Sequence, residues 1–354
     1  MKFSQEIKIG NKLINRDNPT FIIAEAGVNH NGDIKLAKKL IDIAVESNVD
    51  AVKFQTFSTE RLILRDTEKP EYQKKNTESG ENQYEMLKKL ELDKEEHKIL
   101  IDYCNKKGII FLSTPYDEES ADLLEGLGIK AYKIASTDTT NLLLLDYLAK
   151  KDKPVILSTG MSYLSEVEKA VDIFKKNNMS ELILLHCISN YPVEFEKANL
   201  QAIKTLEDRF ELLVGYSDHT AGIGVAPYSI PLGVKVIEKH FTIDKNLPGP
   251  DHKASLSPIE LKSCVELIRK IEKAMGTGIK SPLLEEKQVK LLLQKSLVAK
   301  VSINKGESIK KDMLTAKRPC RGISPLYLEE IVEKKAKMDI KKNSIIEYEM
   351  LEDE

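Results

Sequence analysis

Short apolar runs recur along residues 21–241, and nearly every run ends in a polar or ionisable residue. Most gaps between the runs hold enough amphipathic sequence for one helix. Strand and helix units that alternate in this way are typical of a (β/α)8 barrel, so the pattern predicts an α/β fold of this type. The predicted strands are FIIAE (21–25), AVKFQ (51–55), IIFLS (109–113), AYKIA (131–135), PVILS (154–158), LILLH (182–186), LLVGYS (212–217) and VIEKHF (236–241).

Other patterns predict the elements around these strands. Residues 5–14 alternate apolar and polar positions, which predicts a β-hairpin that plugs the bottom of the barrel. In 33–47 the apolar residues fall on one helical face. Helices are also expected at 94–106 and 258–275, because each follows a capping-box pattern, Asp or Ser with Glu three residues later.

The segment between the second and third predicted strands is too long for one connection, and its first part, 57–84, is polar. A long polar loop above the C-terminal face of a barrel is usually a lid or an arm that contacts the substrate. A disordered surface insertion would have the same composition. The sequence leaves both interpretations open.

The composition and the hydrophobic pattern of the sequence change toward its C-terminal end. Residues 276–293 contain Gly, Pro and many polar residues, which predicts a linker. From 294 onward, short β-type runs replace amphipathic helix. We therefore predict a barrel domain at 1–275 and a small β-rich domain at 294–354. The small domain has little room for a core of its own and is expected to dock on the barrel or on a second subunit.

Composition narrows the classes of partner. The 354 residues carry a formal net charge of −2, which argues against non-specific binding to nucleic acid. No run is long enough to span a membrane, and the N-terminus has no apolar signal core. The four cysteines are scattered and form no CxxC pair, so we expect a reduced, cytoplasmic protein without a cysteine-rich metal site.

Polar residues at the strand ends are the candidates for chemistry. In a barrel of this type the C-terminal strand ends face one shared cavity. This rule gives a first set of site residues: Glu25, Lys53, Gln55, Ser113, Thr114, Lys133, Ser136, Ser158, His186, Ser217, Asp218, His219 and His240.

Two strand-end histidines suggest a metal site. His219 and His240 close the seventh and eighth predicted strands, so they should be neighbours across the mouth of the barrel. Two imidazoles with oxygen ligands or water suit a divalent metal with open positions. Other histidines have simpler interpretations: we expect His97 on the solvent face of a helix and His30 in a turn.

Two lysines interrupt otherwise apolar strands. Lys53 and Lys133 are expected to point into the cavity, and buried lysines are rare unless they are paired. Together with hydroxyls such as that of Ser158, they suggest a site for phosphate or carboxylate. Two alternatives stay open: a Schiff-base lysine, as in barrel aldolases, and structural ion pairs with Glu25 or Glu238.

Chemistry beside an anion and a metal also needs a general base. The carboxylates near the predicted strand ends are Glu25, Asp138, Asp218 and Asp251. The sequence does not rank them.

Nine segments, in order along the chain, resemble the sialic acid synthase family. The tail, from SLVAKVSINKGESI to KRPCRG, looks like the antifreeze-like (SAF) domain that follows the barrel in this family. The resemblance covers essentially the whole chain. The nine segments are AEAGVNHNG (24–32), VKFQTF (52–57), FLSTP (111–115), YKIAS (132–136), ILSTGM (156–161), LLHC (184–187), GYSDHT (215–220), EKHFT (238–242) and PGPD (248–251).

The resemblance implies a reaction, a metal and roles for individual residues. These enzymes condense phosphoenolpyruvate with an N-acetylated amino sugar, with a divalent ion that is typically Mn2+, and with Mg2+ or Co2+ as alternatives. His219 and His240 would bind the ion, and Glu25, Asp138 and Asp251 would be the catalytic carboxylates. The substrates would be held by Lys53, Gln55, Thr114, Lys133, Ser136, Ser158, Ser189, Tyr191, Ser217 and Glu238, and by Arg318 from a second subunit of a domain-swapped homodimer.

Two departures from the family's pattern lie beside the substrates. Asp138 stands where the sialic acid synthases usually have Glu, and Ser189 stands where Asn is common. They bear on the sugar rather than on the reaction type. We expect N-acetylmannosamine as the acceptor, which gives N-acetylneuraminate and phosphate by C–O cleavage. The alternative acceptor is 2,4-diacetamido-2,4,6-trideoxymannose, which gives legionaminic acid, and pseudaminic acid is a further possible product.

Two hypotheses from other classes remain. A Schiff-base aldolase or lyase would use Lys53 or Lys133, and a carbohydrate- or ice-binding protein would rely on residues 290–354 alone. The full set of strand-end polar residues favours the synthase, since a binding scaffold has no need of it.

Overall fold

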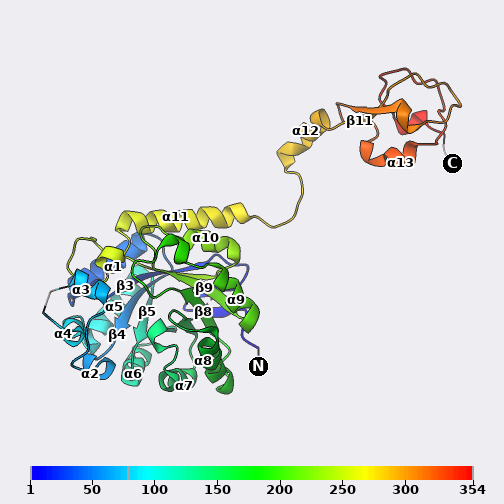
Figure 1. Cartoon of the computed structure of the whole chain (residues 1–354). Helices are drawn as coiled ribbons and strands as arrows, with labels where there is room; N and C mark the ends of the chain where they lie inside the picture. Colours follow the sequence, from blue (N-terminus) through cyan, green and yellow to red (C-terminus); the bar gives the residue numbers. More distant parts are fainter. Residues whose placement is uncertain (1, 78–79, 353–354) are drawn as a thin grey trace. The chain divides into compact units, whose positions relative to one another are not determined.

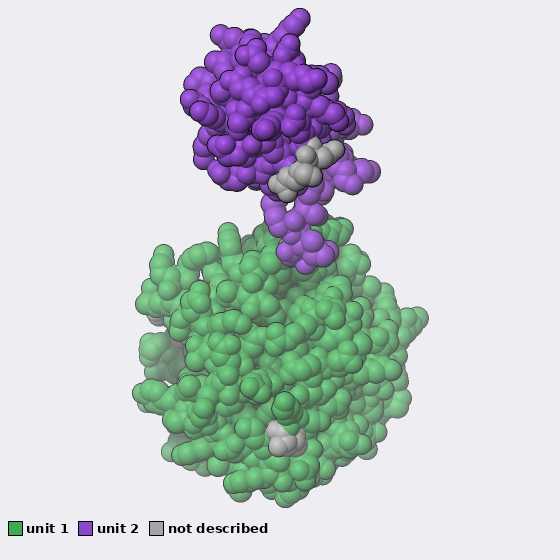
Figure 2. All heavy atoms as spheres, turned by 90° about the vertical axis from the view of Figure 1, so that its right-hand side faces the viewer, with its two compact units in different colours: residues 1–276 green, residues 277–354 purple. Residues whose placement is uncertain are grey.

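The structure is a computed structural model that describes residues 2–77 and 80–352. The chain forms two compact units, residues 1–276 and residues 277–354, shown in Figures 1 and 2. Each unit has its own buried core of apolar side chains. No described helix is both long enough and apolar enough to cross a membrane.

The eight predicted strands form one parallel sheet in the first unit. The hydrogen-bonded order is β5-β4-β3-β10-β9-β8-β7-β6, and the two end strands contact each other, so the sheet closes on itself. The predicted α/β barrel is therefore confirmed. The strands are β3 (Phe21–Gly27), β4 (Ala51–Thr56), β5 (Ile110–Pro115), β6 (Tyr132–Ile134), β7 (Val155–Ser158), β8 (Leu182–Cys187), β9 (Leu213–Asp218) and β10 (Val236–His240).

Amphipathic helices cover the outside of this sheet (Figure 1). Both predicted capping boxes are present. Asp93 and Glu96 begin α5 (Lys94–Lys107), and Ser257 and Glu260 begin α11 (Pro258–Met275). The other helices of this layer are α1 (Ile34–Glu46), α6 (Glu118–Gly126), α7 (Leu142–Ala149), α8 (Leu164–Lys176), α9 (Gln201–Phe210) and α10 (Ala226–Ser229).

A hairpin closes the N-terminal end of the barrel. β1 (Ile7–Ile9) pairs antiparallel with β2 (Lys12–Ile14), within the predicted hairpin. Ile7, Ile9 and Ile14 are buried in one apolar cluster with residues at the starts of barrel strands, such as Phe21 and Ala51. The plug leaves the C-terminal strand ends as the end at which a substrate site can form.

The long polar connection folds into short helices that lie together beside β3, β4 and β5 in Figure 1. These are α2 (Thr59–Leu62), α3 (Glu71–Asn76) and α4 (Gln83–Lys88). An apolar cluster of Val28, Phe57, Met86 and Leu90 packs α4 against the loop after β3. We call residues 57–90 the lid.

The lid also contacts the last barrel loop. The side-chain amide of Asn76 donates a hydrogen bond to the carbonyl of Pro250 at 3.1 Å. The described part of the predicted 57–84 loop is therefore a packed arm rather than a disordered insertion. Residues 78–79 of that loop lie outside the described residues.

The second unit is a small β domain preceded by a helix. β11 (Ser296–Ala299) pairs antiparallel with β12 (Leu314–Lys317), and a short helix α13 (Leu328–Ile331) packs on them. The unit agrees with the small β-rich domain predicted for this region. Residues 284–293, inside the predicted linker, form the helix α12 (Leu284–Leu293), and all of its residues are exposed.

Candidate active site

A cavity of about 530 Å3 lies between the C-terminal strand ends and the lid. The strand ends supply its polar side, and the lid supplies residues such as Leu62 and Met86. The predicted site residues that line the cavity are Glu25, Lys53, Gln55, Thr114, Lys133, Ser136, Ser158, Ser189, Tyr191, Ser217, His219, Glu238, His240 and Asp251.

Four predicted site residues of the barrel do not line this cavity: Ser113, Asp138, His186 and Asp218. Ser113 Oγ lies 2.7 Å from Thr56 Oγ1, and His186 Nε2 lies 3.0 Å from the carbonyl of Ala198. Asp138 is buried in the short 3-10 helix after β6, where its carboxylate accepts from Asn141 at 2.9 Å and from Thr137 at 3.1 Å. It is the neighbouring Thr137 that reaches the cavity. Arg318 belongs to the second unit. Asp218, a candidate base, is buried in an ion pair with Lys239 at 2.8 Å.

Four buried charges form the floor of the cavity. Lys53 Nζ lies 2.8 Å from a carboxylate oxygen of Glu25 and 3.7 Å from one of Glu238. Lys133 Nζ lies 3.7 Å from the other oxygen of Glu238. Glu238 therefore sits between both ammonium groups, while Glu25 has one cation close by. The structural ion pairs proposed from the sequence do exist, but they line a cavity.

This arrangement gives the two carboxylic acids, Glu25 and Glu238, very different pKa values. Burial raises the pKa of Glu25 to about 7, because it outweighs the attraction of Lys53. Burial also disfavours the Glu238 anion, but Lys133 and Lys53 outweigh it and lower the pKa of Glu238 to about 2. At neutral pH Glu238 is thus an anion, and Glu25 can accept or give up a proton.

Hydroxyl groups surround the two lysines. Lys53 donates to Thr114 Oγ1 at 3.0 Å, and Lys133 donates to Ser158 Oγ at 2.7 Å. Ser217 Oγ donates to Glu238 at 3.0 Å. Two ammonium groups and three hydroxyls that face one cavity can hold the oxygens of an anion such as phosphate or carboxylate.

Gly160, after β7, leaves room beside these groups. Its backbone N–H donates to Ser136 Oγ at 3.0 Å. A Cβ atom at this position would meet Ser189 and would lie 2.9 Å from Cys187 Sγ. A larger residue at this position would push these side chains apart, and all three of them line the cavity. Cys187 was not among the predicted site residues, but it lines the cavity because it follows His186 at the end of β8.

The two predicted metal ligands are neighbours. The rings of His219 and His240 lie 5.6 Å apart between centroids, and Tyr191 packs on His219 with centroids at 4.2 Å. His219 Nδ1 contacts the carbonyl of Ile188 at 2.7 Å. Because a carbonyl only accepts, Nδ1 carries the proton and Nε2 keeps its lone pair.

These groups fit a divalent metal. Burial lowers the pKa of both histidines, that of His240 most strongly, so both are neutral, as metal ligands must be. His240 Nδ1 is buried without a hydrogen-bond partner among the described residues. Within residues 2–77 and 80–352, no three or more His, Cys, Asp and Glu side chains come together as a group that could hold a metal ion.

Asp251 lines the cavity from the loop after β10. Burial raises its pKa to about 6, which the attraction of Lys53 only partly offsets. The next residue, His252, anchors this loop: it lies 2.6 Å from Thr242 Oγ1 and 3.2 Å from Asn31 Oδ1. Asp251 is thus a second carboxylate that can exchange a proton near neutral pH.

The expectation that His97 faces solvent was wrong. His97 is fully buried, with Nδ1 2.8 Å from the carbonyl of Asp93 and Nε2 2.7 Å from Thr56 Oγ1. It shares a helical face with Leu100 and Cys104, which pack on the sheet. His30 does lie in a turn, where its Nδ1 accepts the backbone N–H of Gly32 at 3.0 Å.

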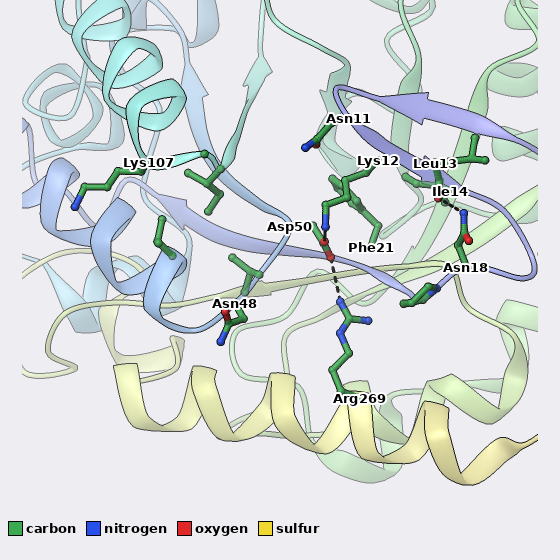
Figure 3. Close-up of a pocket in the computed structure, with 15 residues that line it drawn as sticks. Asn11, Lys12, Leu13, Ile14, Asn18, Phe21, Asn48, Asp50, Lys107 and Arg269 are labelled. Carbon is green, nitrogen blue, oxygen red and sulfur yellow. Dashed lines mark hydrogen bonds and ion pairs between the residues drawn. The ribbon is translucent and has the colours of Figure 1, made fainter.

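A second cavity, of about 740 Å3, lies at the N-terminal end of the barrel (Figure 3). Its central charges neutralise one another. The two carboxylate oxygens of Asp50 lie 2.7 Å from Lys12 Nζ and 3.1 Å from a guanidinium nitrogen of Arg269. These contacts brace the hairpin and α11 against the barrel, which is a structural role.

Comparisons with known proteins identify the family. The model of the NeuB family matches residues 40–280, and the model of the SAF domain matches residues 294–352. An N,N'-diacetyllegionaminic acid synthase of Campylobacter jejuni is 50% identical, over 92% of this chain and 98% of its own length. A synthase of the same name from Legionella pneumophila is 47% identical, over 94% of each chain.

Solved structures agree with this result. The crystal structure of an N-acetylneuraminic acid synthetase from Leptospira borgpetersenii has a TM-score of 0.72 and 40% identity, and the match covers 81% of this chain and 96% of that one. The resemblance inferred from the motifs is confirmed. The chain is an enzyme that belongs to the NeuB family of acid synthases and carries a SAF domain after its barrel.

Proposed function

We propose that this enzyme condenses phosphoenolpyruvate with 2,4-diacetamido-2,4,6-trideoxymannose to give N,N'-diacetyllegionaminic acid and phosphate. The observation that carries the reaction is the single cavity in which two buried lysines, a carboxyl group with a pKa of about 7 and two neutral histidines meet. Such a cavity can bind an anion and activate a carbonyl group side by side.

The choice of acceptor revises the expectation from the sequence. N-acetylmannosamine was the expected acceptor, with the diacetamido sugar as the alternative. Relatives at 50% and 47% identity are named N,N'-diacetyllegionaminic acid synthases, whereas the N-acetylneuraminic acid synthetase compared above is 40% identical. This gradient supports the alternative.

Phosphoenolpyruvate would bind at the lysines. Its carboxylate and phosphate oxygens would accept hydrogen bonds from Lys53 and Lys133, and from hydroxyls of Ser136, Ser158 and Ser217. These donors are already oriented by the contacts described above, so they would stabilise the departing phosphate without rearrangement. In the free enzyme, Glu238 balances the two cations.

The acceptor would bind beside the histidines. His219 and His240 would hold a divalent ion, which the resemblance to the family suggests is Mn2+, with Mg2+ or Co2+ as alternatives. When bound, such an ion acts as a Lewis acid that polarises the aldehyde of the open-chain sugar. Tyr191 packs against both rings and fixes their orientation, and Gln55 lies beside them on the cavity wall.

The bond changes follow from this placement. C3 of phosphoenolpyruvate would attack the aldehyde carbon, and the aldehyde oxygen would take up a proton to become the new hydroxyl group. C2 would gain cationic character, which the Glu238 anion would stabilise. Water would add at C2 and give one proton to a carboxylate, and the tetrahedral intermediate would then lose its hydroxyl proton and phosphate as the C–O bond breaks, which leaves the keto group.

Glu25 is the best placed residue to take the proton from that water. It is buried 2.8 Å from Lys53, and its pKa of about 7 suits a general base at neutral pH. Asp251, with a pKa of about 6, lines the same cavity and is the second candidate. Asp138 is less suitable, since its carboxylate is held by Asn141 away from the cavity lining.

Phosphate release is the direct test. The enzyme would be incubated with phosphoenolpyruvate, Mn2+ and one sugar at a time: the diacetamido sugar, N-acetylmannosamine, or the corresponding altrose. We expect release with the diacetamido sugar and the highest kcat/KM for it. A higher kcat/KM for N-acetylmannosamine would reject the proposed acceptor. A lysine adduct trapped by borohydride would reject the reaction class in favour of Schiff-base chemistry.

We also propose a domain-swapped homodimer in which Arg318 of one chain serves the barrel of the other. The resemblance to the family and the exposed apolar residues of α12, such as Leu284 and Leu292, support it. A mixture of two variants, His240→Ala and Arg318→Ala, would test it at a sugar concentration far below the raised KM of Arg318→Ala, where neither variant alone has appreciable activity. In a swapped heterodimer, one of the two sites combines the unaltered barrel of the Arg318→Ala chain with the unaltered second unit of the His240→Ala chain. Because random pairing makes about half of the dimers heterodimers, co-refolding should restore about a quarter of the wild-type sites. No restored activity would argue against the swap.

A further inference from the structure

Part of the cavity lining that the lid supplies is apolar. Leu62, Ile63, Met86 and Leu87 of the lid line the cavity, together with Val28 from the loop after β3. We call these five side chains the apolar wall. Met86 is only 3% exposed and belongs to the cluster that holds the lid, and Leu62 and Leu87 pack against that cluster.

The apolar wall differs from the rest of the lining. Hydrocarbon side chains neither donate nor accept hydrogen bonds, and a thioether accepts only weakly. The lid also brings the amides of Gln73 and Gln83 to the cavity, where Gln83 Nε2 donates to Gln73 Oε1 at 3.3 Å, and Tyr116 lines it as well; these polar groups are not among the five side chains of the apolar wall. A hydroxyl group placed against the apolar wall would lose its water and gain no partner there.

The chemistry fixes which end of the acceptor reaches this wall. The aldehyde carbon must lie beside the histidines and lysines at the strand ends, because it forms the new bond there. The remaining carbons must then extend away from the strand ends. The lid supplies lining residues that do not belong to the strand ends, as do loops such as that of Pro250 and Asp251, so we take the last carbon of a six-carbon chain to approach the lid.

We propose that the apolar wall is a subsite for the C6 methyl group of a 6-deoxy amino sugar and that it selects against 6-hydroxy sugars. This inference rests on the proposed function, since it takes the aldehyde end of an amino sugar to lie at the histidines. It identifies the residues that would contact the C6 group of the sugar. Neither the names of the relatives nor the pattern of strand-end residues identifies them. Met86 is the central residue of the subsite because it is the most deeply packed.

The expected preference is moderate. An apolar pocket that meets an extra hydroxyl group typically discriminates by about a hundredfold at most, because the pocket can relax or admit a water. We therefore expect kcat/KM for a 6-deoxy acceptor to exceed that for its 6-hydroxy counterpart by about tenfold to a hundredfold.

The test compares matched pairs of sugars. The first pair is 2,4-diacetamido-2,4,6-trideoxymannose and its 6-hydroxy counterpart, and the second is N-acetylmannosamine and its 6-deoxy form. Phosphate release from phosphoenolpyruvate gives kcat/KM for each. Met86→Gln keeps the length of the side chain but adds an amide, and Met86→Leu keeps the apolar character. Leu64→Gln is the matched control, since Leu64 lies in the same lid but is 77% exposed.

Wild type, Met86→Leu and Leu64→Gln should all prefer the 6-deoxy member of each pair, and Met86→Gln should lose about tenfold of that preference. Equal kcat/KM values within each pair in the wild type would overturn the subsite. An unchanged preference in folded Met86→Gln and in Ile63→Thr would also overturn it. Turnover of the second pair alone would reject the proposed acceptor, yet a 6-deoxy preference within that pair would still support the subsite. Turnover of neither pair would overturn both.

Discussion

Lys53 is the residue whose removal should cost the barrel most. Its ammonium group lies 2.8 Å from Glu25 and 3.7 Å from Glu238, and the three side chains are 4%, 2% and 6% exposed. Lys53→Met keeps most of the aliphatic side chain and removes the charge. Two carboxylates would then lie in the buried floor of the cavity with Lys133, which is 3.7 Å from Glu238, as the cation beside them.

The size of the effect follows from this burial. At an effective dielectric constant of about 20, a contact of 2.8 Å between unit charges is worth roughly 6 kcal/mol. Part of this is offset by the cost of desolvating the lysine. Breaking a buried ion pair by removing one partner typically costs about 3–5 kcal/mol, and we expect Lys53→Met to lower the free energy of unfolding by that amount.

The loss should depend on pH in a defined direction. The pKa of Glu25 is about 7 with Lys53 present, above its ordinary value of 4.5, and it should rise further without that cation. A carboxyl group with a raised pKa binds a proton in the folded state that the unfolded state has released, so stability falls as pH rises from about 4.5 through the folded-state pKa. The destabilisation should therefore be smaller near pH 5 than near pH 8.

Urea unfolding followed by circular dichroism at both pH values would measure this. The matched control is Lys98→Met, because Lys98 pairs with Asp102 on the surface and its side chain is 57% exposed. This control should change stability by less than about 1 kcal/mol. Adding Glu25→Gln to Lys53→Met should recover part of the loss. A loss below about 1 kcal/mol for Lys53→Met near pH 8, or equal losses at both pH values, would refute the reasoning.

Four further predictions concern the site. His240→Ala should weaken Mn2+ binding by more than about tenfold in calorimetry and abolish metal-stimulated turnover without loss of helix signal; wild-type activity would contradict the metal assignment. Arg318→Ala should raise KM for the sugar far more than KM for phosphoenolpyruvate, and equal effects would count against a sugar-facing arm. Gly160→Ala places a Cβ 2.8 Å from Ser136 Oγ and 2.9 Å from Cys187 Sγ, so KM for phosphoenolpyruvate should rise about tenfold and the free energy of unfolding should fall by about 1–3 kcal/mol; an unchanged KM would contradict the role of Ser136 in binding this substrate. If Glu25 is the base, kcat/KM should fall as pH drops through about 7, and this limb should vanish in the residual activity of Glu25→Gln.

The barrel and most of its site could be predicted from the sequence because both are local patterns. Each strand is a short apolar run, and its last residues are fixed at the C-terminal face by strand direction alone. Lys53, Lys133, His219 and His240 could therefore be assigned to one cavity, where the structure indeed has them. The capping boxes of α5 and α11 were predictable for the same reason.

Predictions from the sequence were less successful for residues in loops and for the choice of the buried face of a helix. Asp138 follows a strand end, but the short helix that follows β6 turns its carboxylate toward Asn141. His97 looked solvated because its neighbours along the chain are charged, although it lies on the same helical face as Leu100 and Cys104. That spacing was visible in the sequence and was the signal to use.

The sequence by itself determined which residues reach the mouth of the barrel, since strand period and direction need no distant contact. Only the tertiary structure decided which of those residues are charged at neutral pH, because their pKa values depend on which side chains lie beside them. Glu25 and Glu238 are both strand-end glutamates, yet one has a pKa of about 7 and the other of about 2. The difference arises because Glu238 lies between two lysines from separate strands. The apolar wall likewise exists only where the lid folds back over the strand ends, because contacts between segments far apart in the chain bring it there.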